Sequence, residues 1–274
     1  LRKQEGYFEG IGVEVIRGRV ASVAPGEKRL HLGDGSILDY DRLLVATGSR
    51  PVTPPIEGID APGVHACWTL EDARHILNRA SPGASVVLIG AGFIGSIILE
   101  ALALRGVDLT LVEMSNRMVP RMMNERCGGM ITRWCEAKGV GVHTSARVQS
   151  IEVSRGEHPL VVHLEGGKSL PADLVIRATG VVPNTAFLDD SGIGIDNGIR
   201  VNEYLQTSDP DVFAAGAVAR GKEFSTGEHS VLAIQPTAAD HGRIAASNMA
   251  RDRSTPHQGS VVGSRLIFSS RSSA

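Results

Sequence analysis

The sequence lacks an excess of charge of either sign, and this absence narrows the classes of partner. Its 28 Lys and Arg residues nearly balance its 30 Asp and Glu residues, so the formal net charge is -2. No basic cluster stands out along the chain, and neither a nucleic acid nor an anionic membrane surface is therefore predicted as a partner. Small molecules are the preferred partners.

Cysteine is scarce, since Cys67, Cys127 and Cys135 are the only three. They form neither a CxxC pair nor a metal-ligand spacing, and an odd number argues against the disulfide framework of a secreted protein. A reducing cytoplasm is predicted, without a metal site. Two of the cysteines share an apolar stripe at helical spacing, which predicts core packing rather than redox chemistry. The stripe consists of Met123, Cys127, Met130, Ile131, Trp134 and Cys135.

Signals for secretion or membrane insertion are also missing. The opening residues LRKQEGYFEG contain no methionine start, apolar region or signal cleavage pattern, and we expect an internal piece of a longer chain. Residues 85–104 are apolar enough to suggest a transmembrane helix of roughly 20 residues. Glu100 and three glycines within this run argue against that helix, so no membrane span is predicted.

The patterns that are present predict an α/β protein. With 42% hydrophobic and 21% charged residues, the chain is expected to form two globular domains. A Pro- and Gly-rich stretch at residues 49–63 predicts a crossing between them, and a helix is expected from Phe93 to Arg105. Further helices are predicted over the apolar stripe, where Gly139 closes the helix, and at residues 236–250. The predicted strands are residues 13–16, 19–24, 29–32, 42–48, 85–90, 108–113, 140–144, 147–154, 160–167, 172–180 and 211–219.

The stretch VVLIGAGFIG places Gly90, Gly92 and Gly95 between a predicted strand and a predicted helix. The first glycine permits a tight turn, the second lets backbone approach a pyrophosphate, and the third lets the helix pack on the strand. Glu113 ends the next strand, at the spacing of a carboxylate that binds the adenosine ribose. Ala91, Phe93 and Ile94 complete the predicted loop and helix start, where free N–H groups favour phosphate.

The choice between NAD and NADP rests on charge. Glu113 disfavours a 2′-phosphate by repulsion, which favours NADH. Arg117 and Arg121 follow the same strand, and either could instead receive that phosphate or form a solvated face.

One pattern recurs within the chain. LLVATGSRP near residue 45 and LVIRATGVVP near residue 178 share a strand, Ala-Thr-Gly, two residues and a proline. Glycine at the end of such a strand allows close backbone approach. The repetition predicts two similar nucleotide-binding halves.

Four motifs in order resemble the pyridine nucleotide-disulfide oxidoreductase family of FAD-dependent reductases, with the ferredoxin reductase and nitrite reductase type as the most similar branch. The motifs are DYDRLLVATGSRP, VVLIGAGFIG through LTLVE, ADLVIRATGVVPNT and TSDPDVFAAGAVA. The resemblance implies two Rossmann-like FAD/NAD(P)-binding domains, with the NAD domain inserted in an incomplete FAD domain. The expected bounds are 1–82 for a partial FAD domain, 83–188 for the NAD(P) domain, 189–252 for the return to the FAD domain and 253–274 for a truncated interface domain.

The resemblance also assigns residues to the two cofactors, FAD and NAD(P)H. It implies that Thr47, Gly48 and Arg50 lie in the flavin domain and that the turn around Gly216 approaches the flavin. It places Gln235 and Pro236 where the chain passes the isoalloxazine, and Gly180 with Val181 on the nicotinamide side. No side chain is predicted as a catalytic acid or base.

The sequence departs from the family pattern at three places. The glycine motif that binds the FAD pyrophosphate has no counterpart here. Ala217 stands where the family has an Asp that bonds the flavin, which removes a contact of about 1 to 3 kcal/mol. Ile97 stands where many relatives have a Glu near the nicotinamide, and packing is expected for it.

The histidines contribute little to this prediction. His241 lies on a predicted helix without a Ser or Cys nucleophile placed with it, so packing or a surface position is expected. His65, His143 and His163 are predicted to have no partners.

The resulting hypothesis is an NAD(P)H:acceptor oxidoreductase that passes hydride from NADH to flavin and electrons onward to a small molecule or an acceptor protein. A homodimer of the intact protein is a further expectation. The alternative is a non-catalytic NAD(H)-binding remnant that lacks a functional flavin.

Overall fold

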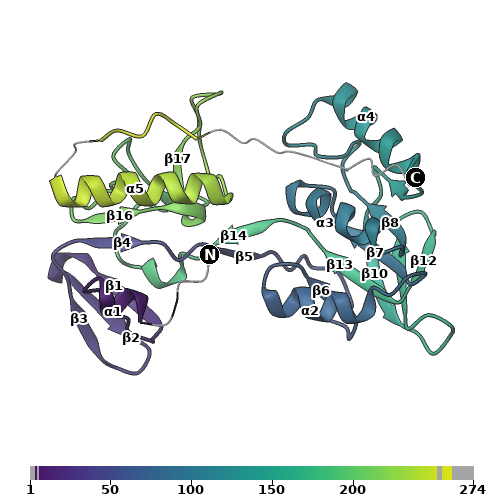
Figure 1. The fold of residues 1–274 in the computed structure, drawn as a ribbon, viewed down its shortest axis with the longest axis horizontal. Helices are drawn as coiled ribbons and strands as arrows, with labels where there is room; N and C mark the ends of the chain where they lie inside the picture. The colour runs from purple at the N-terminus through teal and green to yellow at the C-terminus, as the bar shows by residue number, and fades with distance from the viewer. Residues whose placement is uncertain (1–3, 5, 252–254, 261–274) are drawn as a thin grey trace. The chain divides into compact units, whose positions relative to one another are not determined.

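The computed structural model describes residue 4, residues 6–251 and residues 255–260, and these divide into two compact units (Figure 1). Unit 1 contains the described residues up to Ser49 and those from Pro183 onward. Unit 2 contains Arg50–Val182. The predicted C-terminal interface domain, residues 253–274, falls mostly outside the described residues.

Unit 2 is built on a parallel sheet of five strands, in the order β6-β13-β7-β8-β9. The central strands are continuous apolar runs because both faces of the sheet are covered. The strand bounds are β6 Val64–Ala66, β7 Ser85–Ile89, β8 Asp108–Val112, β9 Gly141–His143 and β13 Leu174–Arg177.

Helices cover one face of this sheet. Leu88, Leu111 and Ile176 point to the core shared with α2 (Leu70–Arg79), α3 (Phe93–Leu104) and α4 (Glu125–Glu136). A capping box between Thr69 and Asp72 starts α2. The predicted strand–helix–strand unit is thereby confirmed, with the helix ending one residue earlier than expected.

A small antiparallel sheet covers the opposite face, where a doubly wound domain would carry further helices. Its strands are β10 (Val148–Val153), β11 (Leu160–Leu164) and β12 (Ser169–Ala172). The first two confirm the strands predicted at residues 147–154 and 160–167. Val87, Ile89 and Val175 alternate with the residues of the helical face and pack against it. Unit 2 therefore has three layers.

Residues 50–82 belong to unit 2, so the expected domain boundary between residues 82 and 83 is displaced to 49/50. The reason is strand pairing, because β6 is the edge strand beside β13 and α2 packs on both. Sequence patterns alone do not reveal this pairing, since β6 and β13 are more than 100 residues apart.

Unit 1 contains a meander, a parallel strand pair, a small three-stranded sheet and a long helix. Its core includes Val45, Leu205, Val212, Val218 and Ala245. Figure 1 shows α5 alongside β16 in this unit. The elements are α1 Tyr7–Gly10, β1 Val20–Ala24, η1 Pro25–Glu27, β2 Arg29–Leu32, β3 Ile37–Asp39, β4 Leu43–Val45, η2 Ala186–Leu188, β15 Ile199–Arg200, β16 Val212–Ala214, η3 Gly216–Val218, β17 Ala219–Lys222, β18 His229–Ser230 and α5 Gln235–Arg251.

The chain crosses between the units at residues 49/50 and 182/183. These crossings form β5 (Ser49–Pro51) and β14 (Val181–Pro183), which pair as a two-stranded sheet. The crossing predicted within residues 49–63 lies at the start of that stretch, between Ser49 and Arg50.

Two local predictions are wrong. Residues 13–16 form no strand, and Val13 and Val15 are 44% and 54% exposed, so no buried face stabilises one. The apolar stripe on α4 is only partly buried, because Cys135 is in the core whereas Cys127, Met130 and Trp134 are exposed. No helix among the described residues is long and apolar enough to span a membrane.

Candidate functional site

The three glycines after β7 have different surroundings. Gly90 has φ +100°, and a Cβ built on it would lie 2.5 Å from the carbonyl oxygen of Ala178. A Cβ on Gly95 would clash with the carbonyl oxygen of Gly90, so only glycine lets α3 approach the strand this closely. A Cβ on Gly92 would meet no atom within 4 Å. The first and third glycines thus serve packing, whereas the second faces open space.

The open space at Gly92 lies at the start of α3. Gly92 is the N-cap residue and provides no side-chain hydrogen bond to the helix. The first N–H groups of a helix have no acceptors within it, and the helix dipole favours negative charge there. Backbone N–H groups of the first turn, including those of Phe93 and Ile94, are therefore suited to bind phosphate oxygens.

Glu113 follows β8 and is 6% exposed. Its Oε2 accepts a hydrogen bond of 2.8 Å from the N–H of Ala91, and its Oε1 accepts one of 2.7 Å from the N–H of Ser115. The carboxylate is therefore fixed beside the glycine loop. Each carboxylate oxygen can accept a second hydrogen bond, so a ribose hydroxyl could still bind.

Arg117 is engaged with its own loop. Its Nε donates to the Met123 carbonyl at 2.8 Å, and its Nη2 donates to the Pro120 carbonyl at 3.0 Å. A third bond, from Nη1, reaches Asn116 Oδ1 at 2.8 Å. The guanidinium thus stabilises residues 116–123. Arg121 is exposed, and it is the other residue predicted to receive a 2′-phosphate.

The first Ala-Thr-Gly turn is held by Asn184. Thr47 Oγ1 donates to the Asn184 carbonyl at 2.8 Å, and the N–H of Asn184 donates to the Gly48 carbonyl at 2.9 Å. Gly48 has φ +66°, and a Cβ there would meet no atom within 4 Å. Arg50 follows in β5 and is exposed.

The second Ala-Thr-Gly turn repeats this arrangement in unit 2. Thr179 Oγ1 donates to the Val52 carbonyl at 3.1 Å, and the N–H of Val52 donates to the Gly180 carbonyl at 3.0 Å. Gly180 has φ +101°, again with open space around it, and Val181 begins β14. Both turns therefore bind a crossing segment, a function that the repeated sequence alone does not reveal.

The Gly216 turn lies in unit 1. β16 pairs in parallel with β4, so the turns at Gly48 and Gly216 follow the same edge of this strand pair. Gly216 has φ +74°, and Ala217 after it is partly buried. Gln235 and Pro236 begin α5 and are exposed.

The residues assigned to FAD supply only part of a flavin site. The methyl group of Ala217 can form no hydrogen bond, and among the described residues β4 and β16 form a sheet of only two strands. Gly90, Gly92, Gly95 and Glu113, in contrast, fit a dinucleotide.

Three expectations about individual side chains are wrong. Ile97 is 52% exposed on α3 rather than packed. His143 Nε2 lies 3.0 Å from Lys168 Nζ, and burial followed by this lysine lowers the pKa of His143. His163 contacts Ser169 and Glu152, at 2.9 and 3.3 Å.

His241 also has partners that the sequence did not indicate. It is 3% exposed, which confirms packing, but its Nε2 lies 3.3 Å from Ser260 Oγ. His257 Nε2 contacts the same hydroxyl at 3.2 Å. No local motif could have shown this, because Ser260 and His241 are 19 residues apart and lie on different elements.

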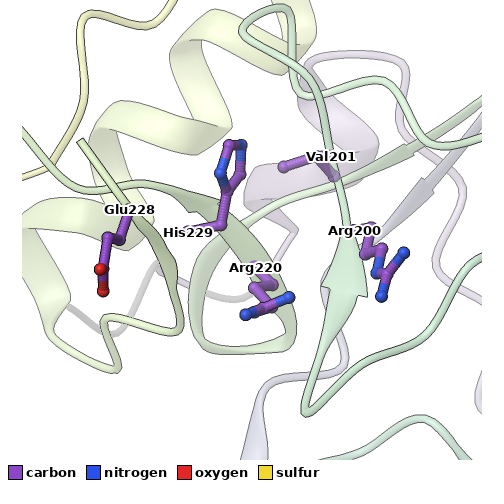
Figure 2. Close-up of a pocket in the computed structure, with 5 residues that line it drawn as sticks. All are labelled: Arg200, Val201, Arg220, Glu228 and His229. Carbon is purple, nitrogen blue, oxygen red and sulfur yellow. The ribbon is translucent and has the colours of Figure 1, made fainter.

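Two cavities are lined by residues other than the predicted cofactor residues. One of about 490 Å³ in unit 1 is lined by the five side chains in Figure 2, namely Arg200, Val201, Arg220, Glu228 and His229. Asp196 forms ion pairs with both arginines. The other, of about 290 Å³ in unit 2, is lined by His65, His75, Asn78 and Arg79. The described residues contain no group of three or more His, Cys, Asp or Glu residues that could hold a metal ion.

Comparison with known proteins decides the family. The pyridine nucleotide-disulphide oxidoreductase family matches residues 7–242. The chain belongs to this family. The predicted family membership and the α/β Rossmann fold are thereby confirmed. The family supports the expected FAD and NAD(P)H cofactors and the oxidoreductase class.

Relatives in this family include redox enzymes of several kinds. The chain is 37% identical over 221 residues to the NADH-dependent phenylglyoxylate dehydrogenase subunit epsilon of Aromatoleum evansii. The aligned region covers 81% of the chain and 52% of that protein. It is 34% identical to an NADH oxidase of Methanocaldococcus jannaschii, over 78% of the chain and 48% of that protein. The chain thus spans about half the length of these relatives.

Solved structures show the same fold. A ferredoxin reductase from Rhodopseudomonas palustris matches the chain with a TM-score of 0.86 at 28% identity. The match covers 94% of the chain and 63% of the reductase. A water-forming NADH oxidase from Lactobacillus brevis, bound to NADH, has a TM-score of 0.86 at 25% identity, over 93% of the chain and 58% of the oxidase.

Proposed function

We propose that this chain is the NADH-binding part of a flavoprotein oxidoreductase. The observation that carries the proposal is the contrast among the three glycines, because Gly90 and Gly95 are packed tightly while Gly92 leaves open space at a helix N-terminus. The first turn of α3 would bind the pyrophosphate, and Glu113 would bind the adenosine ribose. The bound nicotinamide would supply the hydride.

NADH is the proposed nucleotide. The Glu113 carboxylate is held by two backbone N–H groups, and a 2′-phosphate would meet this fixed negative charge. Arg117 could offset the repulsion only by giving up its bonds to Met123 and Pro120.

The proposed acceptor of the hydride is FAD in the intact protein. The turns at Gly48 and Gly216 would approach it, with Thr47, Arg50, Gln235 and Pro236 nearby, while the crossing at Gly180 and Val181 would lie on the nicotinamide side. Electrons would then pass to a protein or a small molecule. An acceptor protein is supported by relatives such as the rubredoxin-NAD(+) reductase of Pseudomonas putida and a covalent putidaredoxin reductase–putidaredoxin complex. A homodimer of the intact protein stays a prediction.

A second candidate function is NAD(H) binding without flavin chemistry. Ala217 favours it, because its methyl group cannot form the hydrogen bond expected of a flavin-binding side chain there. The two candidates share the site at Gly92 and differ only in unit 1.

Calorimetric titration of the chain with NADH and NADPH tests the shared site. Gly92→Ala should fold normally and weaken NADH binding at least tenfold, because the added methyl group occupies the space that the phosphate needs. Gly129→Ala is the matched control in the same unit, since a Cβ there meets only the end of the Arg133 side chain at 3.6 Å. Failure of the unaltered chain to bind NADH would overturn both candidates.

Flavin chemistry then separates the candidates. The proposed reductase predicts that the full-length protein is yellow and that NADH bleaches its flavin spectrum. A colourless full-length protein that binds NADH but never FAD would favour the second candidate.

A further inference from the structure

A buried cluster of two histidines and a serine adjoins the Gly216 turn. The N–H of Gly216 donates to His241 Nδ1 at 3.3 Å, and His241 Nε2 lies 3.3 Å from Ser260 Oγ. His257 Nε2 contacts the same hydroxyl at 3.2 Å, and the two imidazole rings meet edge to face with centroids 4.6 Å apart. All three side chains are at most 9% exposed.

The directions of the two hydrogen bonds at His241 follow from the donors available. Because the N–H of Gly216 donates to Nδ1, a neutral His241 must carry its proton on Nε2. That N–H then donates to Ser260 Oγ. Ser260 Oγ retains its own proton and a second lone pair, so its bond to His257 Nε2 can run in either direction.

Ser260 is not placed as a nucleophile. His241 donates to its oxygen rather than removing its proton, and the residue is only 8% exposed. The cluster instead fixes the tautomer and orientation of His241, and through it the backbone of the turn. Backbone bonds anchor the distal end, from the N–H of His257 to the Glu203 carbonyl at 2.6 Å and from the N–H of Ser260 to the Lys222 carbonyl at 3.1 Å.

We propose that His241 is a positioning residue for the Gly216 turn, with Ser260 and His257 selecting its Nε2–H tautomer. The relevance to flavin rests on the proposed function, which places this turn against the cofactor. The hydrogen-bond order itself requires no cofactor.

The neutral state of His241 is essential to this arrangement. Protonation would place a hydrogen on Nδ1, facing the N–H of Gly216 as a second donor. Burial, followed by the charge of His257, lowers the pKa of His241 to about 4, while Asp240 acts in the opposite direction. The ring is packed against Gly221 of β17, which contributes no charged side chain at that point.

Nitrogen-15 NMR of the full chain, without added cofactor, tests the proposal. At neutral pH we expect His241 to be protonated on Nε2. Observation of the Nδ1–H tautomer in His241 would overturn the proposal, and this measurement needs no variant.

Hydrogen exchange at the Gly216 amide gives a second test. In His241→Leu it should be at least tenfold faster, whereas His241→Gln should restore protection because its amide oxygen can accept and its NH₂ can donate. Unchanged protection in His241→Leu would overturn the proposal. If the chain failed to bind NADH or FAD, the proposed function would be wrong. The His241 tautomer and the Gly216 amide exchange would still test the positioning role of His241.

Discussion

Thr47 and Asn184 hold each other by two reciprocal hydrogen bonds across 137 residues of sequence, from Thr47 Oγ1 to the Asn184 carbonyl at 2.8 Å and from Asn184 Nδ2 to the Thr47 carbonyl at 3.0 Å. Thr179 and Val52 repeat the hydroxyl-to-carbonyl bond at the other crossing. The two Ala-Thr-Gly turns therefore have an equivalent structural function in the two units.

Replacing these threonines by valine should destabilise the protein. Thr47→Val and Thr179→Val each remove one hydrogen bond without changing side-chain volume, at a cost of about 1 kcal/mol. The loss should be larger at Thr179, which is less exposed than Thr47. Urea unfolding measures both, and Thr47→Ser and Thr179→Ser, which keep the hydroxyl, should retain most of the stability.

Gly95→Ala should destabilise unit 2, in contrast to Gly92→Ala. The new methyl group would clash with the backbone carbonyl of Gly90, so α3 must shift, at a cost of roughly 1 to 3 kcal/mol. Thermal unfolding of the two variants, measured side by side, compares them. Equal melting temperatures for the two would contradict the packing described for the glycine loop.

The nucleotide preference should shift toward NADPH when the charge at the end of β8 is changed. Glu113→Gln with Met114→Arg removes one negative charge and adds a positive one at a side chain that is 62% exposed. We expect the ratio of NADPH to NADH affinity to rise at least tenfold, or about 1.4 kcal/mol. Met130→Arg, on an exposed position of α4 in the same unit, is the control and should leave the ratio unchanged.

Stability should fall on acidification because of His241. Its pKa is about 4 in the folded protein, whereas an unfolded histidine titrates near pH 6.5. Between these values the unfolded chain binds the proton and the folded chain does not, so stability is complete above about pH 6.5 and declines toward pH 4. Urea unfolding at several pH values measures the slope, which His241→Gln should reduce.

The thiols of Cys127 and Cys135 should react at different rates. Cys127 is exposed, whereas Cys135 is buried in the core, and burial raises its pKa to about 11. Iodoacetamide labelling of the native chain, followed by mass spectrometry, should modify Cys127 first and leave Cys135 unmodified. Rapid labelling of Cys135 would contradict its core position.

The features predicted best from the sequence are those that depend on residues close together in the chain. Gly90, Gly92, Gly95 and Glu113 all lie in one strand–helix–strand unit, where spacing fixes geometry. The assignment of residues 50–82 failed because it depends on pairing between β6 and β13. The buried faces of α4 and the His241–Ser260 contact likewise depend on neighbours that are distant in sequence, which periodicity does not specify.

The pairing of β5 with β14 has a consequence for how such a protein can be divided. Neighbouring strands lie about 4.8 Å apart, so the two ends of residues 50–182 meet. A contiguous segment with adjoining ends can be excised, or joined by a short linker, without threading the chain. We therefore expect residues 50–182 to fold as a separate module, on which the proposed NADH binding can be measured.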